Sequence, residues 1–175
     1  MQNSPFSKDL IATIRSLYEP AGMKVTSAPL PETESSEYGA YRFGLEGHTI
    51  VFRIAKTTPT KIGQFVTLWK RPNPGGDLVP LDSNDGVAFV VICVFDETHC
   101  GQFVFDQKRL LEKNIMSYNG KGGKRAIRVY PPWTHPVAKE ALKSQEWQLQ
   151  HFLPLMPNEM VDLAEIHKLF TPQGG

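Results

Sequence analysis

The stretch FRIAKTTPTKIGQFVTLWKR, residues 52–71, organises the fold that the sequence predicts. Apolar residues alternate with polar ones on both sides of its Thr/Pro-rich centre, which is the pattern of half-buried strands. We therefore expect a hairpin whose strands are joined by a loop. Its polar positions carry only positive charge and hydroxyl or amide groups, whereas a solvated surface normally mixes both signs. The hairpin is predicted to hold an anion.

The remaining elements predict an α/β fold of three layers, αβα, with a mixed central sheet. The unbroken apolar run at 87–95 is typical of a central strand that is buried on both faces. Further strands are expected at 37–45, at 102–105, at 125–130 and from His48 onward. Capping residues and apolar residues at helical spacing predict helices at 4–18, 106–115, 136–152 and 158–170.

Length and composition indicate one domain over residues 1–175, with a core at about 6–153 and a helical extension at about 154–175. No apolar run approaches the roughly 20 residues that span a bilayer, and residues 1–9 lack the pattern of a signal peptide. We therefore expect a cytoplasmic protein without a membrane partner. In that compartment Cys93 and Cys100 are expected to remain free thiols.

Positive charge is segregated along the chain although the net charge is only +1. One block of basic residues surrounds the hairpin and another covers 108–128, whereas the acidic residues concentrate towards the chain ends. If the sheet brings the blocks together, they form a groove for a phosphate backbone. The residues predicted to contact nucleic acid or another anion are Arg42, Arg53, Lys56, Thr58, Lys61, Gln64, Lys70, Arg71, Lys124, Arg125, Arg128, Tyr130 and Trp133.

Several of these motifs together resemble the MepB family. The resemblance is carried by FRIAKTTPTKIGQFVTLWKR, by the Asp85 strand that leads into GQFVF, and by KRAIRVYPPW followed by SQEWQ, over about residues 6–153. It implies a restriction-endonuclease-like fold, also called the PD-(D/E)XK architecture. Such a fold makes a phosphodiester the first ligand to consider.

The resemblance also implies positions for a nuclease site. Enzymes of that architecture hold Mg²⁺ with an Asp before one strand and a Glu or Gln in the next, followed two residues later by a Lys. Asp85 and Gln102 occupy plausible places, and Glu37 is a further acidic candidate. Val104 stands where the Lys should be, so a relocated Lys from the hairpin, for example Lys56, Lys61 or Lys70, would have to replace it.

Three functions remain open at this point. The first is a nucleic-acid-binding protein that uses the basic hairpin, and the second is a Mg²⁺-dependent nuclease with a rearranged site. The third is a binder of a small anionic ligand or of a protein partner. Purely structural roles also remain open for several residues, because Trp133 can close the core after two prolines and exposed lysines can simply solvate a surface. Neither zinc-ligand spacing nor a phosphate-binding P-loop pattern occurs in the sequence.

Overall fold

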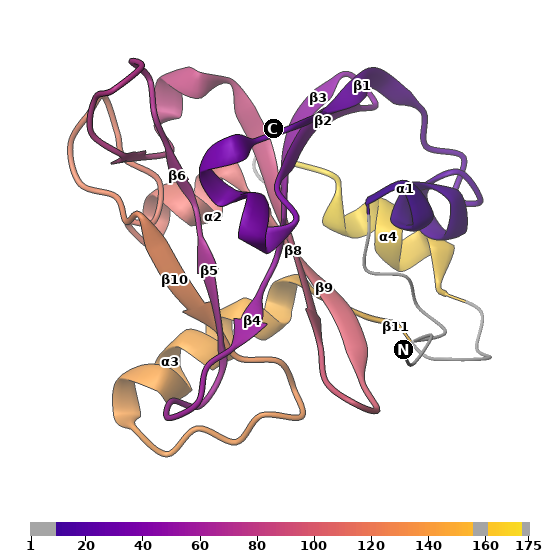
Figure 1. Cartoon of the computed structure of the whole chain (residues 1–175). Coiled ribbons are helices and arrows are strands. Elements are labelled where there is room, and N and C mark those ends of the chain that lie inside the picture. Colours follow the sequence, from indigo (N-terminus) through magenta and orange to yellow (C-terminus); the bar gives the residue numbers. More distant parts are fainter. Residues whose placement is uncertain (1–9, 156–160, 173–175) are drawn as a thin grey trace.

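A six-stranded mixed sheet forms the centre of the fold, in the order β1-β2-β3-β8-β9-β11 (Figure 1). The computed structural model describes residues 10–155 and 161–172. β3 and β8 pair in parallel, and the other neighbours pair antiparallel. The strands are β1 (Val25–Pro31), β2 (Tyr41–Leu45), β3 (His48–Ile54), β8 (Val87–Phe95), β9 (Cys100–Asp106) and β11 (Phe152–Leu155).

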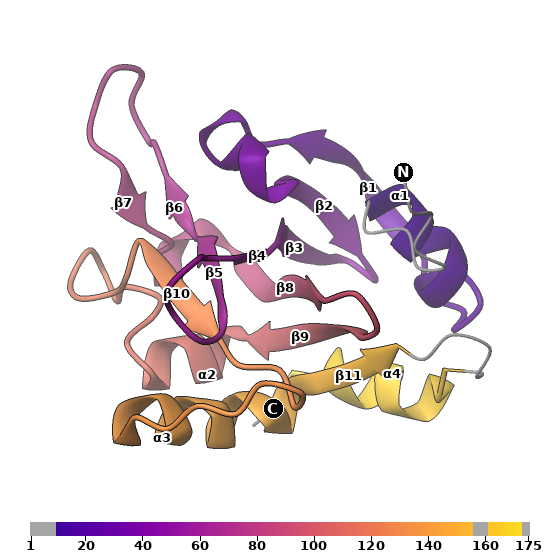
Figure 2. The same ribbon diagram turned by 60° about the horizontal axis from the view of Figure 1, so that its bottom comes forward.

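A second, three-stranded sheet lies against one face of the first, in the order β10-β5-β4 (Figure 2). Its strands are β4 (Lys56–Thr57), β5 (Gln64–Thr67) and β10 (Ala126–Val129). A two-stranded ribbon of β6 (Trp69–Lys70) and β7 (Val79–Pro80) continues beyond it.

Each face of the six-stranded sheet has its own apolar core. On one face pack α1 (Leu10–Thr13), its π-helical continuation η1 (Ile14–Tyr18) and α4 (Leu163–Leu169). On the other face pack the three-stranded sheet and α2 (Gln107–Glu112), while Trp147 of α3 (Lys139–Gln148) contacts the same core. The expected three-layer arrangement is confirmed, with a small sheet in the layer where only helices were expected. Within the described residues, no helix is long and apolar enough to cross a bilayer.

The predicted hairpin is wrong in its pairing. β3 stays in the six-stranded sheet between β2 and β8, and is buried on both faces, because Phe52 and Arg53 are both fully enclosed. The chain leaves this sheet at Ala55, whose N–H donates to the carbonyl of Cys93 at 2.9 Å. Only then does it form β4, which pairs with β5. The stretch therefore connects the two sheets.

Other boundaries also differ from the prediction. The strand expected at 37–45 begins only at Tyr41, because Thr33–Tyr38 forms the 3-10 helix η2 and Gly39 ends it with a φ of 54°. β1 and β11 were not predicted, and both lie at the edges of the sheet. The last helix is capped by Asp162 and begins at Leu163, whereas its expected start at Asn158 lies outside the described residues.

The SQEWQ motif, residues 144–148 of α3, contacts the free edge of the small sheet. Gln148 is 2% exposed, and its Oε1 accepts from Tyr130 N at 2.9 Å while its Nε2 donates to Arg128 O at 3.0 Å. It therefore pairs with the outer edge of β10 as a neighbouring strand would. Gln145 Nε2 donates to the carbonyls of Pro131 and Thr134 and so holds the proline-rich turn.

We expect Gln148→Ala to lower the free energy of unfolding by about 3 kcal/mol, because it leaves a buried N–H and a carbonyl of β10 unpaired. Urea unfolding followed by circular dichroism measures this change. Gln150→Ala, the same substitution at an exposed position two residues on, should cost less than about 0.5 kcal/mol. Equal losses in the two variants would contradict the role assigned to Gln148.

Candidate functional site

Arg53 lies in the interior and is not available to a ligand. Its side chain is fully buried, and its Nε donates to Thr67 O at 3.1 Å, Nη1 to Phe52 O at 3.0 Å and Nη2 to Glu32 Oε2 at 3.0 Å. Burial lowers the pKa of the guanidinium, and the charge of Glu32 opposes that effect. Arg53 therefore joins β3, β5 and the segment before η2, and its prediction as an anion-binding residue is not supported by this placement.

Apart from Asp85, which pairs with Lys70, the acidic partners of the basic stretch come from residues 32–37. Glu32 also accepts from Arg42 Nε at 3.4 Å. Glu34 Oε1 lies 3.7 Å from Arg71 Nε, and Glu37 Oε2 lies 3.4 Å from Lys56 Nζ. The stretch has no acid of its own, but the preceding segment folds against it and neutralises much of its charge. Glu37, predicted as a catalytic acid, serves here as an exposed ion-pair partner.

Glu32→Gln should reduce the free energy of unfolding by about 3 kcal/mol, because it leaves the Arg53 charge buried without a counter-ion. Chemical denaturation at neutral pH measures the loss. Glu34→Gln is the matched control, since the pair of Glu34 with Arg71 is about one-third exposed and should contribute less than about 1 kcal/mol. A Glu32→Gln protein as stable as the control would show that the buried charge is compensated elsewhere.

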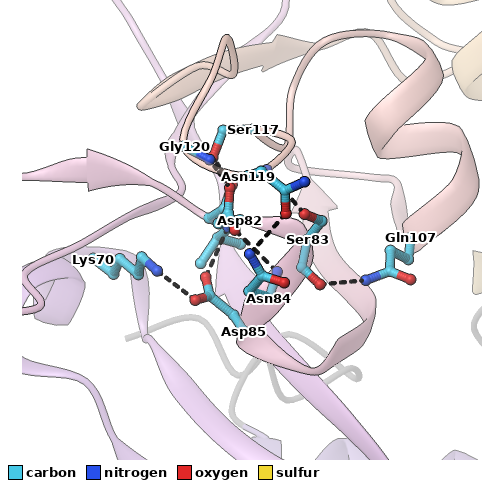
Figure 3. Close-up of polar contacts among 10 residues, drawn as sticks. Lys70, Asp82, Ser83, Asn84, Asp85, Gln107, Ser117, Asn119 and Gly120 are labelled. Carbon is cyan, nitrogen blue, oxygen red and sulfur yellow. Dashed lines mark hydrogen bonds and ion pairs between the residues drawn. The ribbon is translucent and has the colours of Figure 1, made fainter.

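Asp85 lies in a polar cluster at the entrance to β8, shown in Figure 3. It ends the short 3-10 helix η3 (Ser83–Asp85), where its Oδ2 accepts from Asp82 N at 2.7 Å and its Oδ1 pairs with Lys70 Nζ. Lys70 is thus brought to Asp85, as the nuclease hypothesis required of a relocated lysine. Both carboxylate oxygens of Asp85 are nevertheless already engaged within the protein.

Gln102 does not join Asp85. It pairs across the sheet with Cys93, six residues beyond Val87 on β8, which corresponds to about 20 Å along the strand. Its side chain is fully buried in the core on the α1 and α4 side of the six-stranded sheet. There its Oε1 accepts from Tyr18 Oη at 3.1 Å and its Nε2 donates to Cys93 Sγ at 3.3 Å. The two residues were expected to share a metal ion, and that expectation is wrong because the strand register separates them.

These residues do not fit a Mg²⁺ site. Mg²⁺ requires several oxygen ligands around one point, and in residues 10–155 and 161–172 no three His, Cys, Asp or Glu side chains gather to provide them. The polar cluster around Asp85 instead holds the connection between β7 and β8. We derive no step that involves a metal ion.

Asp82 is the most strongly bound carboxylate of this cluster, and sequence reasoning did not identify it. Its Oδ1 accepts from Gly120 N at 2.8 Å and Ser117 Oγ at 2.7 Å, and its Oδ2 accepts from Asn84 N at 3.0 Å. These donors lower its pKa to about 2, the bond from Gly120 contributing most. Asp82 thereby ties η3 to the Gly-rich loop at 119–123.

The contribution of Asp82 to stability should depend on pH. Because its pKa falls on folding from 3.8 to about 2, the contribution is complete above about pH 4 and is lost as the pH falls towards 2. The difference in unfolding midpoint between the natural protein and Asp82→Asn should therefore be constant from pH 7 to about 4.5 and shrink below it. Asp77→Asn, at an exposed loop position, provides the control. A difference that persists unchanged to pH 2.5 would contradict the assignment.

The outer face of the small sheet brings several predicted residues together. Lys56, Phe65 and Arg128 are directly paired neighbours on β4, β5 and β10, so their side chains share one face. The Arg128 guanidinium lies 5.8 Å from the centre of the Phe65 ring. Tyr38 meets the same ring edge-on at 6.1 Å, and Lys56 Nζ lies 4.9 Å above Tyr38. Cations and aromatic rings thus alternate across a partly exposed surface.

Tyr130, the residue directly after β10, continues this face two residues beyond Arg128. Its ring lies over Gly63, where a Cβ atom would come within 2.7 Å of Tyr130 Cε1 and where φ is 86°. Thr58 Oγ1 accepts from Arg128 Nη2 at 2.7 Å and joins the β4–β5 loop to β10. We refer to Tyr38, Lys56, Thr58, Phe65, Arg128 and Tyr130 as the sheet face.

Unpaired cations border the sheet face. In the part of the chain that the structure describes, Lys61, Lys124, Arg125 and Arg128 form no salt bridge. Lys61 is exposed in the β4–β5 loop, and Lys124 and Arg125 are exposed just before β10. These cations keep their charge available to a ligand, whereas Arg42, Arg53, Lys56, Lys70 and Arg71 have acidic partners.

Gln64 and Trp133 point away from the sheet face. Gln64 lies on the inner side of β5, where its Nε2 donates to Phe95 O at 2.7 Å and to Thr57 Oγ1 at 3.1 Å. Trp133 stacks on His99 with ring centres 4.9 Å apart and packs edge-on against Phe152. Both therefore make contacts within the protein, and those of Trp133 agree with the structural alternative. Phe65, an apolar residue of the alternating pattern at 52–71, is part of the sheet face.

The fold and its sheets define a mixed α/β protein, and comparison with known proteins assigns the chain to a family. The sequence matches the family model described as MepB-like over residues 32–154. The structure is similar to a crystal structure of MepB, with a TM-score of 0.70, 34% sequence identity, and coverage of 77% of this chain and 88% of that one. The chain belongs to the MepB-like family, as its motifs predicted. No curated protein matches the sequence.

Proposed function

We propose that this protein binds single-stranded nucleic acid on the sheet face and its bordering cations. The observation that carries the proposal is the cross-strand row Lys56–Phe65–Arg128, which places a partly exposed aromatic ring between cations. Sheet surfaces with such rings bind unpaired bases by stacking, and the adjacent cations hold the phosphates. A duplex does not present its base faces, so single strands are the better fit.

The sheet face has the parts that such binding requires. Tyr38, Phe65 and Tyr130 supply rings along it, and each is only partly buried. Lys61 stands on the loop above one end, and Lys124 and Arg125 stand before β10 near the other. A nucleic-acid strand that crosses β10, β5 and β4 would meet Arg128 before the Phe65 ring and Lys56 after it, with Lys61 and Lys124 towards opposite ends of the β-strands. Its binding would release counter-ions and weaken with salt.

The nuclease alternative has less support. Its residues are divided between the Asp85 cluster and the core around Gln102, and the oxygens of Asp85 are engaged by Lys70 and Asp82. The proposed activity is therefore binding without cleavage. A denaturing gel of the bound strand in the presence of Mg²⁺ distinguishes the two, because binding alone leaves the strand at its full length.

Lys61→Gln should weaken binding to single-stranded DNA or RNA by a similar factor for every sequence, and reduce the dependence of log K on log salt by about 0.7. Phe65→Leu should cost about 1–3 kcal/mol of binding through lost stacking. Fluorescence anisotropy with labelled oligonucleotides at two salt concentrations measures both effects.

Lys168→Gln is the matched control for Lys61→Gln. Lys168 is an exposed lysine on α4, which covers the opposite face of the large sheet. Its removal should leave affinity and salt dependence nearly unchanged. Absence of binding to any oligonucleotide at low salt, or equal effects of Lys61→Gln and Lys168→Gln, would overturn the proposal.

A further inference from the structure

A groove between α2 and α3 lies outside the sheet face and has no part in the function proposed above. It has a volume of about 350 Å³ and is lined by Arg109, Lys113, Lys143, Glu146, Trp147 and Gln150. Arg109 and Lys113 line it from α2 and the residue that follows α2, and the other four residues come from α3 and the segment after it. Three cations and one carboxylate line the groove, so its walls carry a net charge of +2.

Arg109 is held in a fixed orientation at this groove. Its Nε donates to His151 Nε2 at 3.2 Å, its Nη2 to Gln150 Oε1 at 3.4 Å, and its Nη1 lies 3.3 Å from Glu112 Oε2. His151 is only 6% exposed, and its burial lowers the pKa of the ring, which favours the neutral form that can accept this bond. A guanidinium carries five N–H groups, of which these contacts engage three and leave two for a ligand.

The lysines of the groove come from both helices. Lys113 follows α2, and its Nζ lies 5.6 Å from the centre of the Trp147 ring. Lys143 lies four residues before Trp147 on α3, and therefore on the same side of that helix. The described residues provide no salt-bridge partner for either lysine. Two flexible ammonium groups thus stand beside one fixed guanidinium.

Trp147 limits the kind of ligand that fits. One side of its ring is covered by Lys113, and Phe105 packs against it with ring centres 5.1 Å apart. A base could stack on that side of the ring only after Lys113 had moved away, whereas a compact anion can bind beside the lysine. The groove suits a compact anion held by charge-assisted hydrogen bonds.

We propose that the groove between α2 and α3 binds a phosphate group, with Arg109, Lys113 and Lys143 as its ligands. A fixed guanidinium matches two phosphate oxygens, and the lysines add mobile positive charge. The phosphate belongs either to a small phosphorylated molecule or to a nucleic-acid backbone, which present the same chemistry to these residues. The site does not depend on binding at the sheet face.

The test uses the full chain labelled with ¹⁵N and titrated with inorganic pyrophosphate. We expect the indole N–H signal of Trp147, assigned by its loss in Trp147→Phe, to shift saturably, because Lys113 beside the ring moves onto the ligand. The indole signals of Trp69 and Trp133, which lie outside the groove, should not follow it. A Trp147 signal that does not move at any pyrophosphate concentration would overturn the proposal.

Charge removal gives the second measurement. Lys113→Gln and Lys143→Gln should each weaken pyrophosphate binding about tenfold, since each removes a charged partner of the phosphate. Lys139→Gln is the control, because Lys139 is an exposed lysine at the start of the same helix and does not line the groove. A loss as large in Lys139→Gln would identify general charge attraction and would contradict a defined site.

A single-stranded oligonucleotide distinguishes the sources of the phosphate. An oligonucleotide that shifts Trp147 and competes with pyrophosphate assigns the groove to a nucleic-acid backbone. One that binds elsewhere, or does not bind, while pyrophosphate still shifts Trp147 assigns it to a small phosphorylated molecule. Lys61→Gln should leave pyrophosphate affinity at the groove unchanged, because Lys61 does not line the groove. Absence of oligonucleotide binding at the sheet face and absence of pyrophosphate binding at the groove are therefore separate results.

Discussion

The buried ion pair of Arg53 with Glu32 is the interaction on which the arrangement of the two sheets depends. Its guanidinium reaches β5, β3 and the segment before η2 from one position on a central strand. A charge buried to this extent is tolerated only when it has a counter-ion and full hydrogen bonding. The bonds of Arg53 to Thr67 and Glu32 therefore hold the small sheet and the segment before η2 against the large sheet. Tyr38, at the end of η2, then meets the Phe65 ring edge-on.

Charge in the linear sequence was a poor guide to charge in the fold. The absence of acids within 52–71 is real, yet residues 32–37 supply Glu32, Glu34 and Glu37 as partners from a separate segment. Its position cannot be derived from local pattern, because ion pairs between distant segments depend on the tertiary fold. Lys61 and Arg128 have no acidic partner within the described chain, although Arg128 donates to Thr58 Oγ1 and to backbone carbonyls of the β4–β5 loop.

The central layer was predictable from the sequence because strong signals determine it. The apolar run at 87–95 is β8, and the motif order led to the MepB-like family. Strand register was not predictable: it places Gln102 opposite Cys93 and so removes it from Asp85. The alternation of apolar and polar residues also did not show which face of β5 would meet solvent. The six-stranded sheet covers the face opposite Phe65, and that packing depends on the tertiary fold.

The side chain of Gln148 has a consequence beyond local stability. β10 is the last strand of its sheet, and such an edge offers peptide groups to any extended chain that approaches it. One glutamine amide occupies a donor and an acceptor of that edge at Tyr130 and Arg128. A helix side chain thus takes the place of a further strand at this edge, and the N–H of Tyr130 and the carbonyl of Arg128 are not available to pair with another extended chain.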